Sequence, residues 1–362
     1  IVRDWSKYMP EKDGITSVLS AYCLLAYRNL RFERVKWGLE EHGRQGVRFG
    51  AYIYRSQMMM KELAELEAFP RDERDIKFPE TLADLGVADT NTVHAKDFGW
   101  NAENASAALQ QAMASGATTV VLDDMGAPWR ITSVTNRSNQ RLLFKKGVKV
   151  LADRATQEKD PKGVEMFCAW KCKNVIFEGE GDNSIGKWEN WEERRKYNKK
   201  YGGCGINLRA SDHVVIRNLR IAECSMDAIC LSGSEPYNTE TFIDNCVLDS
   251  CYRQAMSVCG SDGLYCRKVQ FLNTRGGAPM AGVDLEPAIE CYPNTNLYFF
   301  DCTFAGNGGG GFVFYTSTYA PMAVQLKRCT FAPNGPAALE VFARCGVYLG
   351  AGVKAPAKIL VE

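Results

Sequence analysis

The sequence predicts an all-β solenoid, namely a parallel β-helix, and two sets of recurring strands are the basis for this prediction. In the first set, an apolar-x-apolar core returns after each 20–30-residue turn of chain, in segments 204–209, 227–232, 254–259, 281–286 and 310–315. A short strand that recurs at this period is typical of solenoids, in which each turn buries its apolar face against its neighbours. The segments lack the 3.6-residue period of a helix.

Alternation along these strands separates inward from outward side chains. Two inward columns result, Ile206, Ile229, Met256, Val283 and Phe312 in one and Leu208, Leu231, Val258, Leu285 and Phe314 in the other. The outward positions are mostly polar and include Asn207, Arg209, Ser232, Ser257, Asp284, Glu286 and Tyr315. Asp227 and Gln254 precede their strands at a corner of the coil, where alternation does not decide their direction.

The second set confirms the period within the sequence. Residues 213–221 are predicted to form two short strands with a bend at Asn218, and the shape returns at 241–248, 264–271, 297–304 and 324–331. Superposition gives three further inward columns: Ile216, Ile243, Cys266, Phe299 and Leu326; Leu219, Cys246, Val269, Cys302 and Cys329; and Ile221, Leu248, Phe271, Phe304 and Phe331. Three short parallel strands per turn are therefore expected.

The pattern divides the chain into residues 1–92, without the repeat, and residues 93–362, the β-helix. Residues 15–39 and 57–66 are predicted to be helical, and Phe69-Pro70 and Phe78-Pro79 interrupt the chain. We interpret residues 1–92 as a helical cap or arm against the first turns, because an open β-helix end exposes strand edges. An arm for a partner or for homo-oligomerisation is the alternative.

Composition narrows the classes of function. The net charge of +1 provides no argument for a nucleic-acid partner, and no apolar run approaches the ~20 residues of a membrane span. The chain begins at Ile1 with neither methionine nor signal peptide, as expected of a mature or trimmed form, and we expect an extracytoplasmic location, periplasmic or secreted.

The cysteines are predicted to be mostly free thiols. Many of the fourteen fall at inward positions, where Cys packs as a small hydrophobe. Cys168 and Cys172 lack the second pair that a structural zinc site requires. No metal ligands and no cofactor are therefore expected, except Ca²⁺ if the protein is a lyase.

The start of the predicted β-helix resembles that of pectin-lyase-like right-handed β-helix proteins. Asp97-Phe98-Gly99, a helical run at 105–116 and the strand 117–122 are similar to the strand, capping helix and first coil of that superfamily. The motifs that usually follow are replaced by residues 100–103 and 123–129, so the chain is identified with a divergent branch. The resemblance covers residues 93–362 and implies a single-stranded right-handed β-helix of about ten turns with an N-terminal capping helix.

Three carboxylates, Asp227, Asp284 and Glu286, are candidate catalytic residues. Asp284 and Glu286 are two apart on one strand, so they point the same way roughly 6.5–7 Å apart, and Asp227 lies two turns away, roughly 9–10 Å along the axis. Glycoside hydrolysis requires a carboxylic acid and a second carboxylate at about such separations. Repulsion within the group raises the pKa of at least one member, which suits a general acid.

A distant resemblance to polygalacturonase-type glycoside hydrolases is restricted to one strand. Their second catalytic strand reads aspartate-aspartate-cysteine-isoleucine-alanine-isoleucine, and residues 226–231 keep only the second aspartate, at Asp227. Gln254 stands where they have a catalytic histidine, and Cys204 stands where they have a further aspartate. The resemblance therefore implies a hydrolase whose carboxylates have moved to Asp284 and Glu286.

Residues of two further kinds are candidates for substrate binding. Arg209, Arg253, Gln254 and Tyr315 surround the carboxylates, and Tyr237 belongs to a loop that follows a site strand. The insertion 178–203 interleaves aromatic residues, including Trp188 and Trp191, with lysines and arginines. Aromatic faces stack on sugar rings and arginines bind sulfate or carboxylate groups. An ordinary charged helix covering the solenoid is the other interpretation of this insertion.

These observations favour a glycoside hydrolase acting on an acidic or complex polysaccharide or oligosaccharide. A polysaccharide lyase or uronate epimerase on the same fold is the first alternative, with the three carboxylates around Ca²⁺ and Arg209, Arg253 or Tyr315 near the proton. A non-catalytic carbohydrate-binding or structural β-helix is the second. Fold alone does not choose among them.

Overall fold

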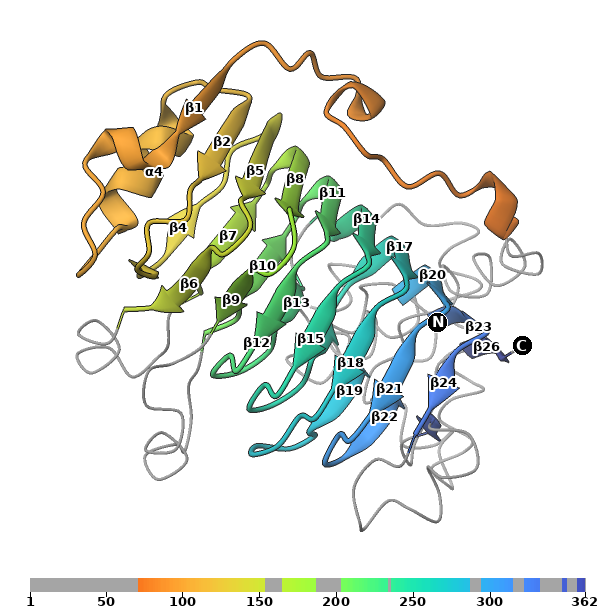
Figure 1. The fold of residues 1–362 in the computed structure, drawn as a ribbon. Helices are drawn as coiled ribbons and strands as arrows, with labels where there is room; N and C mark the ends of the chain where they lie inside the picture. Colours follow the sequence, from red (N-terminus) through yellow and green to blue (C-terminus); the bar gives the residue numbers. More distant parts are fainter. Residues whose placement is uncertain are drawn as a thin grey trace, which may run out of the picture.

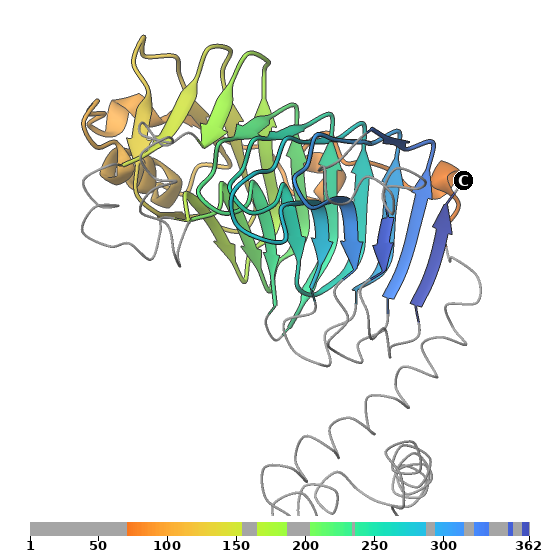
Figure 2. The ribbon, with the colours of Figure 1, turned by 90° about the horizontal axis from the view of Figure 1, so that it is seen from below.

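The computed structural model describes residues 71–153, 165–186, 203–233, 236–286, 294–314, 322–332, 347–349 and 357–361. Within these ranges the chain winds into coils that stack along one axis (Figures 1 and 2). Neighbouring strands of the stack are parallel and come from successive coils. The predicted parallel β-helix is therefore the fold of this protein.

The strands form three sheets, which we call A, B and C. Sheet A has the order β1 (Thr92–His94), β2 (Thr119–Leu122), β5 (Gln140–Phe144), β8 (Lys173–Gly179), β11 (Asp212–Arg217), β14 (Asn238–Asp244), β17 (Ser261–Arg267), β20 (Asn294–Phe300), β23 (Met322–Lys327) and β26 (Ala357–Val361). Sheet B has the order β3 (Trp129–Ile131), β6 (Lys149–Ala152), β9 (Ser184–Gly186), β12 (Arg220–Ala222), β15 (Val247–Asp249), β18 (Gln270–Leu272), β21 (Thr303–Ala305) and β24 (Thr330–Phe331). Sheet C has the order β4 (Val134–Thr135), β7 (Phe167–Trp170), β10 (Ile206–Arg209), β13 (Ile229–Ser232), β16 (Met256–Val258), β19 (Ala281–Leu285), β22 (Gly310–Phe314) and β25 (Val347–Leu349).

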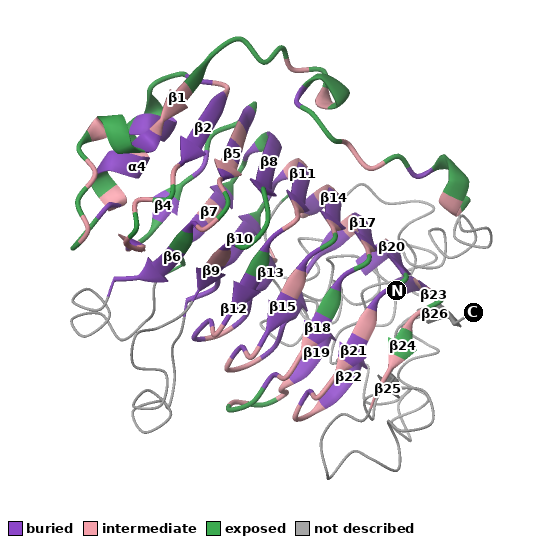
Figure 3. Cartoon of the chain, in the orientation of Figure 1, coloured by how far each residue is buried: buried purple, intermediate pink, exposed green. Residues whose placement is uncertain are grey.

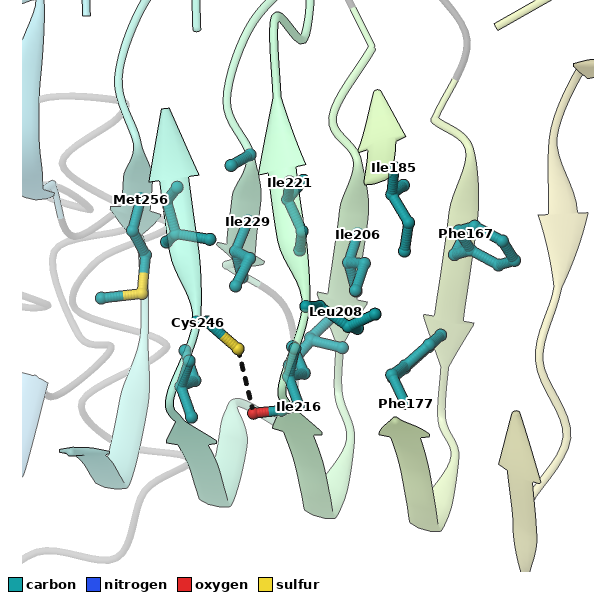
Figure 4. Packing of buried hydrophobic residues seen from close by; sticks show 14 of the residues in the cluster. Phe167, Phe177, Ile185, Ile206, Leu208, Ile216, Ile221, Ile229, Cys246 and Met256 are labelled. Atoms are coloured by element: carbon teal, nitrogen blue, oxygen red, sulfur yellow. Dashed lines mark hydrogen bonds between the residues drawn. The ribbon is translucent and has the colours of Figure 1, made fainter. Parts of the chain in front are cut away.

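The register of sheet C confirms the first predicted inward column. Ile206 pairs with Ile229, which pairs with Met256, and the column continues through Val283 to Phe312. All five side chains are fully buried in one continuous core, part of which Figure 4 shows. Side chains of sheets A and B complete this core, so each coil is held by apolar contact with the coils before and after it.

The bend between sheets A and B is made by residues with left-handed backbone. Asn218 lies there with φ 55°, as predicted for its bend, and Asn245 and Lys268 repeat the conformation on the next two coils. Asparagine tolerates this conformation better than most residues. The side chain of Asn245 also donates to Asn218 Oδ1 at 2.9 Å, so the bends of neighbouring coils are linked.

Short helices accompany the first coils. The 3₁₀ helix η4 (Ala95–Phe98) is followed by the α-helix α4 (Ser106–Ala114), which lies at the β1–β2 end of the solenoid (Figure 1). Leu109, Ala112 and Met113 of α4 are buried in the main core. Gln140 of β5 donates to the carbonyl oxygens of Met113 and Ala117, both at 3.0 Å, and ties the helix to the first coils.

Residues 71–91, which we call the strap, run along sheet A on its outer side (Figure 1). The strap contains the 3₁₀ helices η2 (Glu73–Asp75) and η3 (Ala83–Leu85). Ile76 and Leu82 pack on outward apolar side chains of sheet A that would otherwise face solvent: Ile176, Val215, Phe242, Tyr265, Tyr298 and Phe300. Burial therefore extends to the outer side of this sheet (Figure 3).

The helices predicted at 15–39 and 57–66, and with them the proposed oligomerisation arm, lie outside the described residues. Within the described part of the chain, no helix has the length and hydropathy of a membrane span.

Candidate functional site

The outer face of sheet C carries a layer of polar side chains. The register places Asn207, Cys230, Ser257 and Asp284 in one outward column on four successive coils. Outward side chains of a solenoid are normally exposed, but Asn207, Ser257 and Asp284 are at most 5% exposed. Because buried polar groups cost free energy unless they are paired, their partners determine what this face can do.

Asp227 is fully buried and is held by a bidentate ion pair. Arg253 donates from Nε to Oδ1 at 3.0 Å and from Nη2 to Oδ2 at 2.8 Å, and Ser257 Oγ also donates to Oδ2 at 2.8 Å. Burial raises the pKa of Asp227, while Arg253 and Ser257 act in the opposite direction. With both oxygens occupied, this carboxylate is positioned by the protein and in turn positions Arg253 and Ser257.

Ser257 links Asp227 to Asp284. Gln254 is fully buried, and its Nε2 contacts Ser257 Oγ and donates to Asp284 Oδ2 at 3.1 Å. The chain Asp227–Ser257–Gln254–Asp284 therefore connects the two buried carboxyl groups across three successive coils. Alternation could not decide the directions of Asp227 and Gln254 at their corner, and the structure turns both to the outer face.

Asp284 is the second carboxyl group of this face whose pKa is raised. It is 2% exposed, and burial together with the negative charge of Glu286 raises its pKa to about 7. Its Oδ1 has no hydrogen-bond partner in the described part of the chain, and the same is true of Gln254 Oε1. Glu286 follows Leu285 on the same outward side and is partly exposed. One buried, protonatable carboxyl thus lies beside one carboxyl that solvent reaches.

The predicted substrate-binding residues do not lie together. Arg253 and Gln254 donate to the carboxylates of the buried network, Arg253 to Asp227 and Gln254 to Asp284. Arg209 is exposed, and its guanidinium lies 5.2 Å over the ring of Trp170, a side chain that is 53% exposed. Tyr237 is partly buried immediately before β14. Tyr315, Trp188 and Trp191 lie outside the described residues.

Three cysteines of this face were not among the sequence candidates. Cys230 points outward between the inward Ile229 and Leu231, and its thiol lies within hydrogen-bonding reach of the thiols of Cys204 and Cys259. The ligand atoms of Cys204, Asp227 and Cys230 lie within 4.8 Å of one another, an arrangement that could hold a metal ion. Alternation along β13 already places Cys230 outside the core, and this pattern could have identified it as a candidate residue of the outer face.

Comparison with known proteins bears on the fold. Residues 189–351 match the family model described as the right handed beta helix region. The coiled part of the chain is a right-handed parallel β-helix. This is the fold that the resemblance to pectin-lyase-like proteins implied, and no curated protein matches the chain significantly.

The chain is similar in part to several solved structures. A Parabacteroides merdae protein provisionally named a glycosyl hydrolase is 16% identical with a TM-score of 0.43, over 58% of this chain and 96% of its own. An A. fortis iota-carrageenase of family GH82 is 13% identical with a TM-score of 0.41, over 71% of this chain and 62% of its own. The tailspike of E. coli bacteriophage HK620 is 11% identical with a TM-score of 0.44, over 75% and 55%. All three TM-scores are below 0.5, so these structures do not indicate the function of the outer face of sheet C.

Proposed function

We propose that the outer face of sheet C hydrolyses glycosidic bonds of an acidic polysaccharide, with Asp284 as the general acid and Glu286 as the second carboxylate. The observation that carries the proposal is the state of Asp284, whose pKa is raised to about 7 by burial and by Glu286. A general acid is most effective when its pKa lies near the working pH. A glycosidase needs one such carboxyl beside another that remains ionised.

The two carboxyl groups have geometry and surroundings that suit different roles. They are two residues apart on one outward side, so their Cα atoms are roughly 6.5–7 Å apart, close to the carboxyl separations of glycosidases. When Asp284 is protonated, its Oδ1 carries an O–H that has no partner among the described residues. Because this atom is buried, substrate binding would have to uncover it before it donates to the leaving glycosidic oxygen. Glu286, which solvent reaches, would act as base toward water or as nucleophile at the sugar carbon.

Asp227 takes a positioning role in this proposal. Its two oxygens are occupied by Arg253 and Ser257. Ser257 in turn contacts Gln254, which donates to Asp284 Oδ2. This network leaves Oδ2 as the acceptor and Oδ1 as the oxygen that carries the proton. Replacement of Asp227 would therefore misplace Asp284 rather than remove a reacting group.

The substrate class follows from the exposed part of the face. Trp170, Arg209 and Glu286 share one outward column, because Trp170 pairs with Arg209, Arg209 pairs with Ser232, and Glu286 extends that column two coils further on. An exposed aromatic ring stacks on sugars, and a guanidinium binds sulfate or carboxylate groups. A saccharide chain lying along the solenoid axis would meet both on its way to Glu286.

The test is a turnover assay on a panel of sulfated and uronic polysaccharides. Wild type is expected to produce new reducing ends without an unsaturated product, and Asp284→Asn is expected to lose about 10²–10⁴ of this rate. Asp262→Asn is the matched control, because Asp262 lies on sheet A and accepts from Thr295 and Asn296. Equal loss in both variants, or full activity in Asp284→Asn, would contradict the assignment.

One observation also favours the lyase alternative. Asp284 Oδ1 and Gln254 Oε1 are unpartnered acceptors in the described chain, and with Glu286 they form a set of oxygens of the kind that binds Ca²⁺. In that case the product would absorb ultraviolet light as an unsaturated uronate, and EDTA would abolish turnover. Binding of polysaccharide without turnover, unchanged when the carboxylates are replaced, would instead identify a non-catalytic β-helix.

A further inference from the structure

The described cysteines differ in their surroundings. Cys172, Cys246 and Cys302 are buried in the main core, and each thiol donates to a backbone carbonyl, at 3.3 Å, 3.6 Å and 3.8 Å respectively. Figure 4 shows this contact between Cys246 and the carbonyl oxygen of Ile216. These thiols behave as small core hydrophobes that also satisfy a carbonyl. Cys204, Cys230 and Cys259 have another environment, the polar outer face of sheet C.

These three thiols converge on Cys230 from successive coils. Cys204 precedes β10, Cys230 lies within β13, and Cys259 follows β16. The thiol of Cys230 adjoins those of Cys204 and Cys259 and contacts Ser232 Oγ at 3.4 Å. Cys259 is partly exposed and Cys230 is buried, so the group is open to solvent on one side only.

Asp227 joins the thiols to make a ligand set with the dimensions of a small metal site. Its carboxylate and the sulfurs of Cys204 and Cys230 lie within 4.8 Å of one another. In a tetrahedral zinc site with Zn–S of 2.3 Å, neighbouring sulfurs are about 3.8 Å apart, so the ligands would have to close by about 1 Å or less. The coils supply these groups from backbone that is fixed by the sheet, which limits the ordering cost.

The surroundings also provide charge balance and orientation. Two thiolates and the Asp227 carboxylate carry three negative charges, which a divalent ion and the Arg253 guanidinium neutralise. The Arg253 and Ser257 hydrogen bonds leave Asp227 Oδ1 with a single donor, so a lone pair remains for a metal ion. Hydrogen-bonded carboxylate ligands of this kind are common in metal sites, where the outer partner orients the ligand.

We propose that Cys204, Asp227 and Cys230 form a three-ligand binding site for Zn²⁺ on the outer face of sheet C. Thiolates with one carboxylate match the preference of this borderline-soft ion, whereas Ca²⁺ and Mg²⁺ prefer oxygen ligands alone. Each coordinating thiol gives its proton to solvent when the ion binds. The metal site shares Asp227 with the network that positions Asp284, but its ligands include neither Asp284 nor Glu286, the two groups that react in the proposed hydrolysis.

The test uses Co²⁺ as a spectroscopic probe of the full chain, after removal of metal and with a reductant that contains no thiol. We expect one Co²⁺ per chain and a near-ultraviolet thiolate-to-Co²⁺ charge-transfer band that Zn²⁺ abolishes on displacing the probe. Cys230→Ser should lose the band, and Asp227→Asn should keep it with an affinity about 10-fold or more weaker. Cys168→Ser, from the same outward column two coils away, is the control and should behave as wild type.

A second measurement on the wild-type protein avoids reliance on the folding of variants. Alkylation followed by peptide mass spectrometry should show that Zn²⁺ protects Cys204 and Cys230 while Cys168 reacts at an unchanged rate. A charge-transfer band that survives Cys230→Ser, or equal labelling of Cys204 and Cys230 with and without Zn²⁺, would overturn the site. Neither readout uses turnover, so absence of hydrolysis on every polysaccharide would leave the result standing.

Discussion

A carboxyl group that is buried beside another negative charge destabilises the folded state when it ionises, and Asp284 is such a group. Its pKa is raised from 3.8 to about 7. The folded protein therefore holds this proton at pH values where the unfolded chain has released it. The contribution of Asp284 to stability is least unfavourable below pH about 4, worsens as the pH rises toward 7, and has its full cost above that value.

Asp284→Asn should remove this pH dependence. At pH 8 we expect the variant to be more stable than wild type by a few kcal/mol, because a buried charge is lost, and at pH 4–5 we expect the difference to shrink or reverse. Urea unfolding of both proteins at several pH values measures the effect, since the titrations of groups that are not coupled to Asp284 cancel in the difference. A difference that is constant with pH would show that Asp284 titrates as an ordinary carboxyl. Gained stability with lost turnover is the combination expected of a functional residue.

At the scale of strands and turns, the sequence predicted the features that recur on every coil, namely the inward columns and the bends. Ile206, Ile229 and Met256 form an inward column because alternation and the coil period together determine their positions. Asn218 could be placed at a bend because the apolar pattern breaks there. The orientations of Asp227 and Gln254 could not be predicted, since both stand at a corner where no period applies. Their directions are set by Arg253, Ser257 and Asp284, contacts that exist only after the coils have stacked.

The position of the strap along sheet A also could not be predicted from its own residues. Residues 71–91 contain no repeat, and Phe78-Pro79 predicted only an interruption. The signal was elsewhere, in Phe242, Tyr265 and Tyr298 on the outer side of sheet A. These rings stack in register on three successive coils, with centroids 4.8 Å and 5.5 Å apart. A column of outward aromatic residues on a solenoid indicates a covered face, because exposing it would be unfavourable.

Phe78→Ala should weaken the attachment of the strap. The Phe78 ring packs edge-on against Phe242, with the ring centroids 5.6 Å apart. The guanidinium of Arg267 lies over the Phe78 ring, 4.1 Å from its centroid. Loss of these contacts should cost about 1–3 kcal/mol, below the cost of a fully buried Phe because Phe78 is only partly buried. Limited proteolysis of residues 71–91 and urea unfolding measure this. Lys77→Ala, at the exposed neighbouring position of the strap, is the control, and equal sensitivity of the two variants would count against the role of Phe78.

For the whole molecule, the strap changes how stability is distributed. In a simple solenoid each coil contacts only its neighbours, so the ends can unfold independently. Here Glu73 pairs with Arg328 just after β23, whereas Thr90 and Asn91 bond to Thr118 just before β2. One continuous segment therefore touches coils near both ends of the described stack, with Ile76 and Leu82 buried between these contacts.

This connection predicts greater cooperativity than stacking alone provides. A protease site inserted between Ala88 and Asp89, which are both exposed, would cut the strap without disturbing its buried residues. After cleavage, urea unfolding should broaden, with a lower m-value or separate transitions for the early and late coils, because the strap no longer ties the two ends of the stack together. The same insertion left uncleaved is the control. If the cut protein keeps the m-value of the uncut one, stacking alone makes the β-helix a single cooperative unit, and the strap serves only to cover the aromatic column of sheet A.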